Sequence, residues 1–317
     1  MIFHCGGGIV VLDNEEVDKL LDMSSAVELV ENAITAKTCG NLLCPPRFRL
    51  ETSRGNLVFT SGAIVDPYVD VLGFRVYSTF PTSTSGETQA TMVYDGKTGV
   101  IKGIILGNRL GALRTGAIGG VAIKHLAKEG VCEVGVLGTG IQAETQLIAC
   151  IAVREVSSVK VFSPNSSHCA AFVEKFRKLC NITQVATARD CVEDVDILIV
   201  ATNSSSPVLQ TEWLSPNVHI NSVGPKFVDK HELPEDLPLK CSHIFTDSIS
   251  QLDSYTPTHF IKECSSAPQV RDLSEVVGSL QPFQREKSAI TLFLSVGLSG
   301  TEVIIGNDVI ERSNATL

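Results

Sequence analysis

A glycine-rich turn follows an apolar segment near the middle of the chain. Residues 134–137 are apolar, residues 138–143 read Gly-Thr-Gly-Ile-Gln-Ala, and residues 140–151 have the composition of a helix. In this Gly-x-Gly-x-x-Ala pattern, Gly138 allows a tight turn, Gly140 lets the backbone approach a pyrophosphate, and Ala143 lets the helix pack closely on its strand. The first N–H groups of the helix would then point at the phosphates. The pattern predicts a dinucleotide-binding turn; the simpler alternative is an ordinary glycine-rich turn between a strand and a helix.

The residues after the next expected strand, 158–162, bear on the choice between NAD and NADP. An acidic residue at this point favours NAD because it binds the ribose 2′-hydroxyl. Here the chain reads Ser163-Pro164-Asn165-Ser166, so no carboxylate would oppose a 2′-phosphate. The hydroxyls and Asn165 could bind such a phosphate. We therefore expect NADP(H) or NAD(H), with a preference for NADP(H).

The region before the glycine-rich turn predicts a domain of helices and an antiparallel sheet. Helices are expected over 14–22 and 25–37, and Ser25 and Glu28 have the spacing of a capping box. The β-rich segments are 47–51, 57–60, 71–77, 90–94 and 100–106, with a hairpin turn at 95–99. A helix over 110–127 would link this domain to the next.

From residue 133 onward, short strands alternate with helices, which predicts a parallel, doubly wound sheet. The expected strands are 133–137, 158–162, 184–186, 197–201, 219–222 and 244–246. The segments 289–295 and 297–310 would return to the first domain. We therefore predict an α/β protein in which a Rossmann-type domain with a doubly wound parallel sheet, residues 118–290, is inserted into a discontinuous α+β domain, residues 1–117 and 291–317.

Composition and charge exclude several classes of function. The 317 residues include 26 Lys and Arg against 35 Asp and Glu, which gives a net charge of −9. Without a long basic tract, the chain lacks the electrostatic features of a nucleic-acid-binding protein. No apolar stretch approaches the roughly 20 residues of a membrane helix, and the first residues do not read as a signal peptide. We expect a soluble, cytoplasmic protein with neither a nucleic-acid nor a membrane partner.

The cysteines and histidines do not have the spacing of a metal site. The ten cysteines include no Cys-x-x-Cys pair, and the seven histidines are scattered. We expect no metal, and cysteines that are reduced and mostly buried.

Three motifs lie in order along the chain: Leu-Arg-Thr-Gly-Ala at 113–117, the glycine-rich turn at 138–143, and His-Ile-Asn-Ser-Val-Gly at 219–224. Shorter ones are Pro-Pro-Arg at 45–47, Gln-Ala-Thr at 89–91, Ala-Thr-Asn at 201–203 and Ser-Val-Gly at 295–297. With this spacing the sequence resembles the ornithine cyclodeaminase/μ-crystallin family over nearly its whole length. That family includes ornithine cyclodeaminases, alanine dehydrogenases, ketimine and pyrroline-2-carboxylate reductases, hydroxyproline dehydratase-like enzymes and a thyroid-hormone binder. The resemblance implies the fold, a nicotinamide cofactor and a homodimer, but it leaves the reaction open.

The resemblance also implies which residues contact the ligands. Arg47 and Arg114 would hold a substrate carboxylate, which suits a guanidinium because it offers two parallel donors. For each arginine the alternative is a surface or interdomain ion pair. Arg75 and Thr91 complete the expected substrate-binding set. The expected cofactor-binding residues are Arg114, Thr115, Gly138, Thr139, Gly140, Ile141, Gln142, Ser163, Asn165, Ser166, Thr202, Asn203, Val223, Gly224 and Ser295.

At two positions the chain departs from the family pattern, and both departures add positive charge. Arg75 stands where many members have a lysine, and Lys226 stands where the cyclodeaminases have an aspartate. Lys226 would repel the cationic side chain of ornithine. Together with Arg47 and Arg114, these residues instead indicate an anionic substrate that bears a carboxylate.

The expected reaction is NAD(P)H-dependent reduction of a cyclic ketimine carboxylate, such as Δ1-pyrroline-2-carboxylate or Δ1-piperideine-2-carboxylate. Lys226 is the candidate proton donor and Arg75 the second candidate catalytic residue. Lys226 would otherwise be a solvated loop lysine beside Asp229 and Glu232. The alternative functions are a redox-neutral cyclodeaminase or hydroxyproline dehydratase-like lyase, an alanine dehydrogenase-like enzyme, and a ligand binder that holds the cofactor without turnover.

Overall fold

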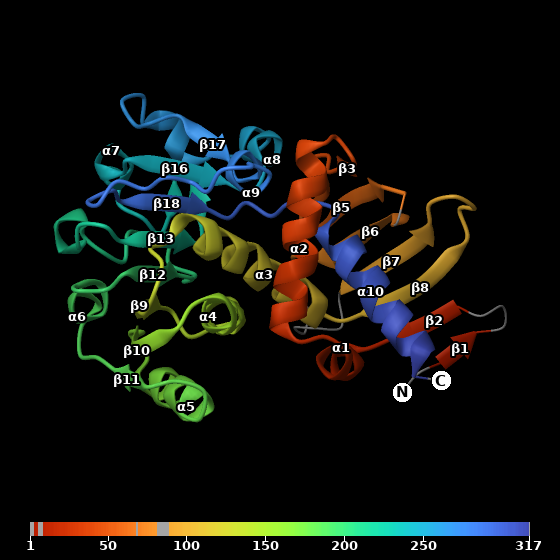
Figure 1. Cartoon of the computed structure of the whole chain (residues 1–317), viewed down its shortest axis with the longest axis horizontal. Coiled ribbons are helices and arrows are strands. Elements are labelled where there is room, and N and C mark those ends of the chain that lie inside the picture. Colours follow the sequence, from red (N-terminus) through yellow and green to blue (C-terminus); the bar gives the residue numbers. More distant parts are fainter. Residues whose placement is uncertain (1–2, 6–8, 68, 81–88, 317) are drawn as a thin grey trace. The chain divides into compact units, whose positions relative to one another are not determined.

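The computed structural model describes residues 3–5, 9–67, 69–80 and 89–316. The chain forms two units: unit 1 consists of Met1–Arg114 and Gly297–Leu317, and unit 2 consists of Thr115–Val296. The division falls within helix α3 (Arg109–Leu126), which begins in unit 1 and ends in unit 2. Each unit has a large sheet of its own (Figure 1).

Unit 1 is built on a mostly antiparallel, eight-stranded sheet in the order β1-β2-β8-β7-β6-β5-β3, with β4 paired to β5. The strands are β1 (Phe3–Cys5), β2 (Ile9–Leu12), β3 (Leu42–Leu43), β4 (Phe48–Thr52), β5 (Gly55–Val65), β6 (Asp70–Ser78), β7 (Gln89–Asp95) and β8 (Ile101–Leu106). Helices α2 (Met23–Thr38) and α10 (Thr301–Ala315) lie on one face of the sheet, and α1 (Asn14–Leu20) contacts α10 (Figure 1). The helices and strands predicted here are present, but Asp22 rather than Ser25 caps α2, because its carboxylate accepts the N–H of Ser25.

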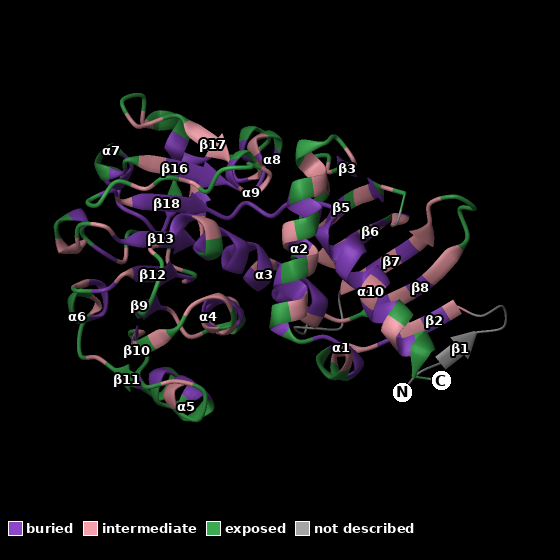
Figure 2. Cartoon of the chain, in the orientation of Figure 1, coloured by how far each residue is buried: buried purple, intermediate pink, exposed green. Residues whose placement is uncertain are grey.

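The central strands β6, β7 and β8 of unit 1 alternate between buried residues and residues on the outer face, as the two-residue period of a strand requires. One row across the sheet, on the buried side, consists of Thr60, Arg75, Thr91 and Ile105. The next row, on the opposite side, consists of Ser61, Phe74, Met92 and Ile104, none of which is buried (Figure 2). The register therefore places an arginine in the interior of the unit.

Unit 2 contains an eight-stranded sheet in the order β11-β10-β9-β12-β13-β18-β16-β17, in which every neighbouring pair is parallel. The strands are β9 (Cys132–Leu137), β10 (Val156–Phe162), β11 (Ile182–Gln184), β12 (Ile197–Val200), β13 (His219–Ser222), β16 (His243–Thr246), β17 (Val270–Asp272) and β18 (Thr291–Leu294). The longer helices are α4 (Ile141–Val153) and α5 (Ser166–Phe176), and shorter ones are α6 (Ala188–Val192), α7 (Leu237–Lys240), α8 (Ile249–Asp253) and α9 (Ser274–Val277). The strand order reverses between β9 and β12, as in a Rossmann-type sheet, so the predicted fold class is confirmed.

The C-terminal return to unit 1 begins later than we predicted. We placed residues from 291 onward in the first domain, but β18 lies between β13 and β16 in the parallel sheet. Each of its residues is buried, which is typical of a strand covered on both faces. The chain therefore leaves unit 2 only after Val296.

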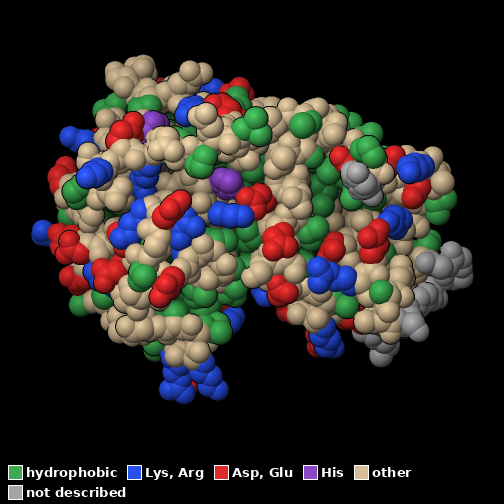
Figure 3. Space-filling view, in the orientation of Figure 1, with side chains coloured by type: hydrophobic (Ala, Val, Ile, Leu, Met, Phe, Trp, Pro, Cys, Tyr) green, Lys and Arg blue, Asp and Glu red, His purple; other side chains and the backbone are tan. Residues whose placement is uncertain are grey.

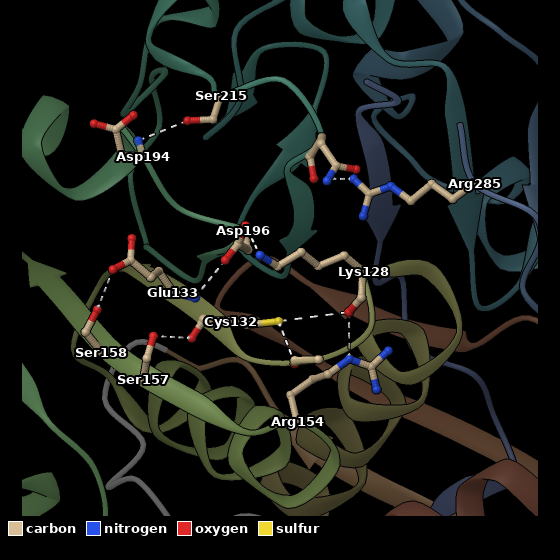
Figure 4. Close-up of polar contacts among 12 residues, drawn as sticks. Lys128, Cys132, Glu133, Arg154, Ser157, Ser158, Asp194, Asp196, Ser215 and Arg285 are labelled. Atoms are coloured by element: carbon tan, nitrogen blue, oxygen red, sulfur yellow. Dashed lines mark hydrogen bonds and ion pairs between the residues drawn. The ribbon is translucent and has the colours of Figure 1, made fainter. Parts of the chain in front are cut away.

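At the amino edge of the parallel sheet, polar groups of the protein bind one another (Figure 4). Asp196 accepts the N–H of Glu133 at 2.9 Å and pairs with the ammonium group of Lys128 at 2.7 Å. Arg154 donates to the carbonyl of Lys124 at 2.8 Å, one of the last carbonyls of α3, which lack an N–H partner within the helix. Ligands of such folds bind instead at the opposite, carboxyl edge of the strands.

A buried polar network crosses the parallel sheet at β13. His219 contacts the Thr291 hydroxyl and the Asn221 carbonyl, each at 2.8 Å, and Asn221 donates to Gln146 at 3.0 Å. Burial lowers the pKa of His219 to about 3, so the ring is neutral. Because its Nε2 donates to Asn221, its Nδ1 accepts from Thr291, and both ring nitrogens are paired.

We expect the free energy of unfolding to fall as the pH drops from 6.5 towards 3. Burial lowers the pKa of both His219 and His259 from 6.5 to about 3. Below pH 6.5 the unfolded chain binds protons at these rings that the folded chain excludes, so stability that is complete above pH 6.5 is progressively lost. Each ring contributes about 1.4 kcal/mol per pH unit. Urea unfolding across this range should give a shallower fall for His259→Phe than for the wild type; equal slopes would contradict the assignment.

Candidate active site

Unit 2 contains a cavity of about 910 Å³ at the carboxyl edge of its parallel sheet. Its lining comes from the β9–α4 turn, from α5 and from the segments that follow β10, β12 and β13. Of the residues predicted to bind the cofactor, Gly138, Thr139, Gly140, Ile141, Gln142, Ser163, Thr202, Asn203, Val223 and Gly224 line this cavity. The fold thus brings together residues from segments that are far apart in the sequence.

The β9–α4 turn has the backbone that its glycines predict. Gly138 has φ +108°, and a Cβ there would lie 2.3 Å from the carbonyl oxygen of Ala201. Gly140 caps α4 without a side-chain hydrogen bond, and a Cβ there would meet no atom within 4 Å. The first N–H groups of α4 therefore have space beside them, and the helix dipole favours an anion at this end. These residues fit a dinucleotide whose pyrophosphate lies at the turn.

Helix α5 contributes two basic side chains to the cavity that we did not predict. His168 and Lys175 line it together with Ser163, and Lys175 pairs with Glu144. Their spacing of two helical turns on α5 is the signal that could have revealed them. Asn165 instead caps α5, accepting the N–H of His168 at 3.3 Å. Neither Asn165 nor Ser166 is among the described residues that line the cavity.

Lys226 is buried, so the alternative of a solvated loop lysine is wrong. Its side chain is 3% exposed, and its ammonium group donates to the carbonyl of Gly224. It begins the short strand β14 (Lys226–Phe227), which pairs with β15 (Lys230–His231). Its positive charge acts on the carboxylate of Glu232, which is also buried. Lys226 is therefore part of the buried polar interior of unit 2.

Arginines from three separate segments gather in unit 1. Arg75 lies on β6 and Arg114 in the first half of α3, and both are buried; Arg47, just before β4, is half-buried. A Cβ at Gly297 would lie 2.9 Å from Nη2 of Arg47 and 3.1 Å from Nη1 of Arg114. A Cβ at Gly111 would lie 2.5 Å from Nη2 of Arg75. Glycines thus leave the room that these guanidinium groups occupy.

Glu302 on α10 brings a negative charge to this arginine cluster, Arg47, Arg75 and Arg114. Glu302 is fully buried and accepts a hydrogen bond from Thr60. Burial raises the pKa of its carboxyl, but the charges of Arg114 and Arg75 outweigh this effect and hold the pKa below its ordinary value. Burial, followed by the charge of Arg114, lowers the pKa of Arg75 to about 10, so Arg75 is still charged at neutral pH.

The Nε–H groups of Arg75 and Arg114 stand out among the guanidinium donors of the cluster. Arg75 donates to Gln89 and stacks over the ring of Tyr77 at 4.5 Å, and Arg47 donates to the Tyr77 hydroxyl at 3.4 Å. The Nε atoms of Arg75 and Arg114 are buried without a hydrogen-bond partner among the described residues. Buried donors and charges are normally paired, so the cluster fits an anionic ligand, and a carboxylate matches the guanidinium fork.

Besides the arginines, two residues of unit 1 bear on this site: Thr91, which we predicted from the sequence, and Glu302, which we did not. Thr91 lies next to Arg75 in the buried row of the sheet, as part of the predicted substrate-binding set. Glu302 was missed because no motif surrounds it, and only the packing of α10 on the sheet brings it to the arginines. Thr115 and Ser295 belong to unit 2 but are not among the described residues that line its cavity.

Comparison with known proteins gives the family. The sequence model of the ornithine cyclodeaminase/mu-crystallin family matches residues 9–316. The chain belongs to the ornithine cyclodeaminase/mu-crystallin family. The resemblance stated from the short motifs is therefore confirmed.

Relatives in the ornithine cyclodeaminase/mu-crystallin family match almost the whole chain. The alanine dehydrogenase of Archaeoglobus fulgidus is 27% identical over 312 residues, covering 96% of this chain and 95% of the relative. The structure of Thermococcus litoralis Δ1-pyrroline-2-carboxylate reductase in complex with NADH and L-proline is 29% identical, with a TM-score of 0.86 over 96% of this chain and 98% of that one. An archaeal alanine dehydrogenase dimer with bound NAD is 25% identical, with a TM-score of 0.85 over 97% of each chain.

The remaining features concern the metal-binding side chains, the helices, the surface charge and the cysteines of the described ranges. There, no group of three or more His, Cys, Asp or Glu side chains could hold a metal ion. No described helix is long and apolar enough to cross a membrane. On the face drawn in Figure 3, Lys and Arg side chains lie among Asp and Glu side chains. The described cysteines are free thiols, and Cys132, Cys150, Cys169, Cys191 and Cys241 are buried.

Proposed function

We propose that this family member is an NAD(P)H-dependent reductase of a cyclic ketimine carboxylate such as Δ1-pyrroline-2-carboxylate or Δ1-piperideine-2-carboxylate. The observation that carries the proposal is the arginine cluster, in which Arg47, Arg75 and Arg114 come together and the buried Nε–H groups of Arg75 and Arg114 have no partner among the described residues. The cavity and glycine turn of unit 2 support the cofactor. The similar reductase that holds NADH and L-proline supports the substrate class, because proline is the reduced form of Δ1-pyrroline-2-carboxylate.

The residues of the proposed site have separate roles in binding the substrate and in the reaction. Arg47, Arg75 and Arg114 bind the substrate carboxylate and so fix the orientation of the adjacent imine carbon, with Thr91 beside Arg75. The cavity and glycine turn of unit 2 would hold a reduced nicotinamide cofactor, which when bound would supply the hydride for this carbon. Lys226 keeps the imine nitrogen protonated, which makes the carbon more electrophilic. The cofactor roles of Arg114, Thr115, Asn165, Ser166 and Ser295 are part of the same proposal.

We propose NADP(H) as the preferred cofactor. The cavity lining includes Ser163, which directly follows β10, and His168 and Lys175 of α5, and the carboxylate of Glu144 is paired with Lys175. Positive charge near the end of the second strand favours a 2′-phosphate, whereas an acidic residue there would favour the free hydroxyl of NAD. We expect kcat/KM to be higher with NADPH than with NADH. An equal or higher value with NADH would contradict this preference.

The proposed reaction is tested by following the absorbance of reduced nicotinamide with each imine and each cofactor. We expect one mole of cofactor to be oxidised for each mole of imine consumed. A requirement for ammonia and a 2-oxo acid would indicate an alanine dehydrogenase-type reaction. Product formation without net cofactor oxidation would indicate a redox-neutral lyase. Cofactor binding without turnover of any imine would indicate a ligand-binding protein.

Replacing Lys226 by methionine is expected to lower kcat about 100-fold, within the usual range for loss of a general acid. The loss should be smallest at low pH, where solvent can keep the imine protonated, so the pH profile of kcat should change shape. The measurement is kcat from pH 6 to 10 for the wild type, Lys226→Met and Lys230→Met, in which an exposed lysine of β15 is replaced as a control. An unchanged rate and pH profile for Lys226→Met would exclude the proton-donor role.

We also propose a homodimer formed through the outer face of the unit 1 sheet. This face carries Phe74, Met92 and Ile104 in one row and the exposed side chains of Leu72 and Leu106. A contiguous apolar patch on a sheet is typical of an interface. The similar alanine dehydrogenase that binds NAD is a dimer.

Phe74→Asp is expected to convert this dimer to a monomer, because it would place a charge in the centre of the apolar row. The side chain faces away from the buried side of the sheet, so the fold should be retained. Analytical ultracentrifugation of Phe74→Asp and of the exposed-turn control Lys97→Asp gives the test. A monomeric wild type, or a Phe74→Asp variant that stays dimeric, would refute this interface.

A further inference from the structure

Glu232 places a buried carboxylate behind the cavity of unit 2. Its side chain is 0% exposed and follows directly after β15. Its Oε2 accepts the N–H and the hydroxyl of Thr202, both at 2.9 Å. Its Oε1 accepts the hydroxyl of Ser222 at 2.9 Å and the N–H of Gly224 at 2.6 Å. One carboxylate therefore satisfies four donors.

These donors belong to the two loops that form one side of the cavity. Thr202 lies just after β12 and Gly224 just after β13, and both line the cavity. Glu232 itself is not one of the described residues that line the cavity. The three residues are in close contact, since a Cβ at Gly224 would lie 2.1 Å from Oε2 of Glu232 and 2.5 Å from the carbonyl oxygen of Thr202. The carboxylate thus sits where the two loops meet.

We propose that Glu232 is a positioning residue for cofactor binding. It holds the loops of Thr202 and Gly224 at the separation that a dinucleotide requires. This inference rests on the proposed nicotinamide-binding role of the cavity, but it does not depend on which substrate is reduced. Backbone N–H groups that are tied to a buried carboxylate have little freedom to shift, so the loops are pre-organised before the cofactor binds. Glu232 acts through the loops and does not touch the ligand.

Only a carboxylate satisfies all four donors. If the side chain were an amide, its NH₂ group would face either the N–H of Gly224 or the N–H of Thr202, whichever way the amide were turned. Two donors would then oppose each other in a buried site, which costs more than the loss of one hydrogen bond. Glu232→Gln keeps the size and shape of the side chain while breaking the loop geometry.

Lys226 supplies the opposite charge that a buried carboxylate needs. Burial raises the pKa of the Glu232 carboxyl, and the charge of Lys226 together with the hydrogen bonds from Thr202 and Ser222 opposes that rise. Two roles for Glu232 can therefore be separated by experiment. If Glu232 served only to neutralise Lys226, removing both charges together would restore the cofactor site. If it positions the loops, the double variant stays defective.

The test compares the dissociation constants of NADH and NADPH, measured by nicotinamide fluorescence, for four variants and the wild type. We expect Glu232→Gln to weaken both cofactors at least tenfold, which is about 1.4 kcal/mol. The double variant Lys226→Met/Glu232→Gln should be as weak. Ser222→Ala removes one donor without altering the cavity lining, so it should weaken binding only a few-fold. The control Glu235→Gln, at a neighbouring side chain that is 84% exposed, should bind as the wild type does.

The outcomes separate this inference from the proposed function. Wild-type affinity in folded Glu232→Gln, or in the double variant, would overturn the positioning role. If Glu232→Gln fails to fold, unchanged affinity in Ser222→Ala would overturn it instead. A wild type that binds cofactor but reduces no imine would refute the proposed function and leave the role of Glu232 standing. A wild type that binds neither cofactor would refute both.

Discussion

Arg114→Met is expected to lower kcat/KM for the imine substrate by about 10³-fold, chiefly by raising KM. Losing a charge-assisted bond to a carboxylate costs several kcal/mol when the remaining groups are buried. Arg114 is 7% exposed and meets Arg47 at Gly297, so water cannot readily take its place. Arg114→Lys should lose less, because it keeps the charge while losing the two parallel donors.

The measurement is steady-state kinetics with the imine varied at saturating reduced cofactor. Arg109→Met is the matched control, because Arg109 begins the same helix and pairs with Asp18 outside the arginine cluster. Circular dichroism and the melting temperature establish that the Arg114 variants are folded. A folded Arg114→Met variant whose KM stays near that of the wild type would show that the substrate carboxylate binds elsewhere.

Gly138→Ala is expected to weaken binding of reduced cofactor by two orders of magnitude or more, on the order of 3 kcal/mol. The glycine has φ +108°, and an added Cβ would lie 2.3 Å from the carbonyl oxygen of Ala201. Both the turn and the loop after β12 would have to move, and both line the cavity. A methyl group at this position therefore disturbs the place where the pyrophosphate is expected to lie.

Variants at two other glycines distinguish the effect of backbone strain from the effect of a steric collision. Gly130 has φ +84° with nothing within 4 Å of an added Cβ, so Gly130→Ala should cost about 1 kcal/mol of stability and leave cofactor affinity unchanged. Gly140 has no protein atom within 4 Å, so Gly140→Ala should fold normally but weaken the cofactor, whose phosphates need that space. Fluorescence titration and thermal unfolding of the three variants give the comparison. Wild-type affinity in Gly138→Ala would show that the dinucleotide lies away from this turn.

Features that depend on neighbouring residues could be predicted from the sequence. The dinucleotide turn follows from Gly138 and Gly140, since a positive φ and a close approach both require glycine within a few positions. The alternation of strands and helices after residue 133 predicted the parallel sheet, because each strand and helix shows its pattern in residues that are close in the sequence. The end of unit 2 was predicted less well, because β18 shows the same apolar run whether it pairs in one sheet or the other.

The burial and pairing of the charged side chains could not be predicted from the sequence, because they depend on segments that meet only in the folded chain. The motifs and the departures from the family pattern indicated Arg47, Arg75 and Arg114, but only the packing of α10 on the sheet brings the buried carboxylate of Glu302 to the arginines.

The same limit applies in unit 2. The sequence proposed Lys226 as a proton donor and left a solvated loop lysine as the alternative, and the structure buries it beside Glu232. The sequence by itself therefore determined the family, the architecture and the glycine-rich turn between β9 and α4. The tertiary structure decided which charges are desolvated and which carboxylate joins the segments after β12 and β13, because desolvation is a property of all the neighbours of a group and not of its position in the chain.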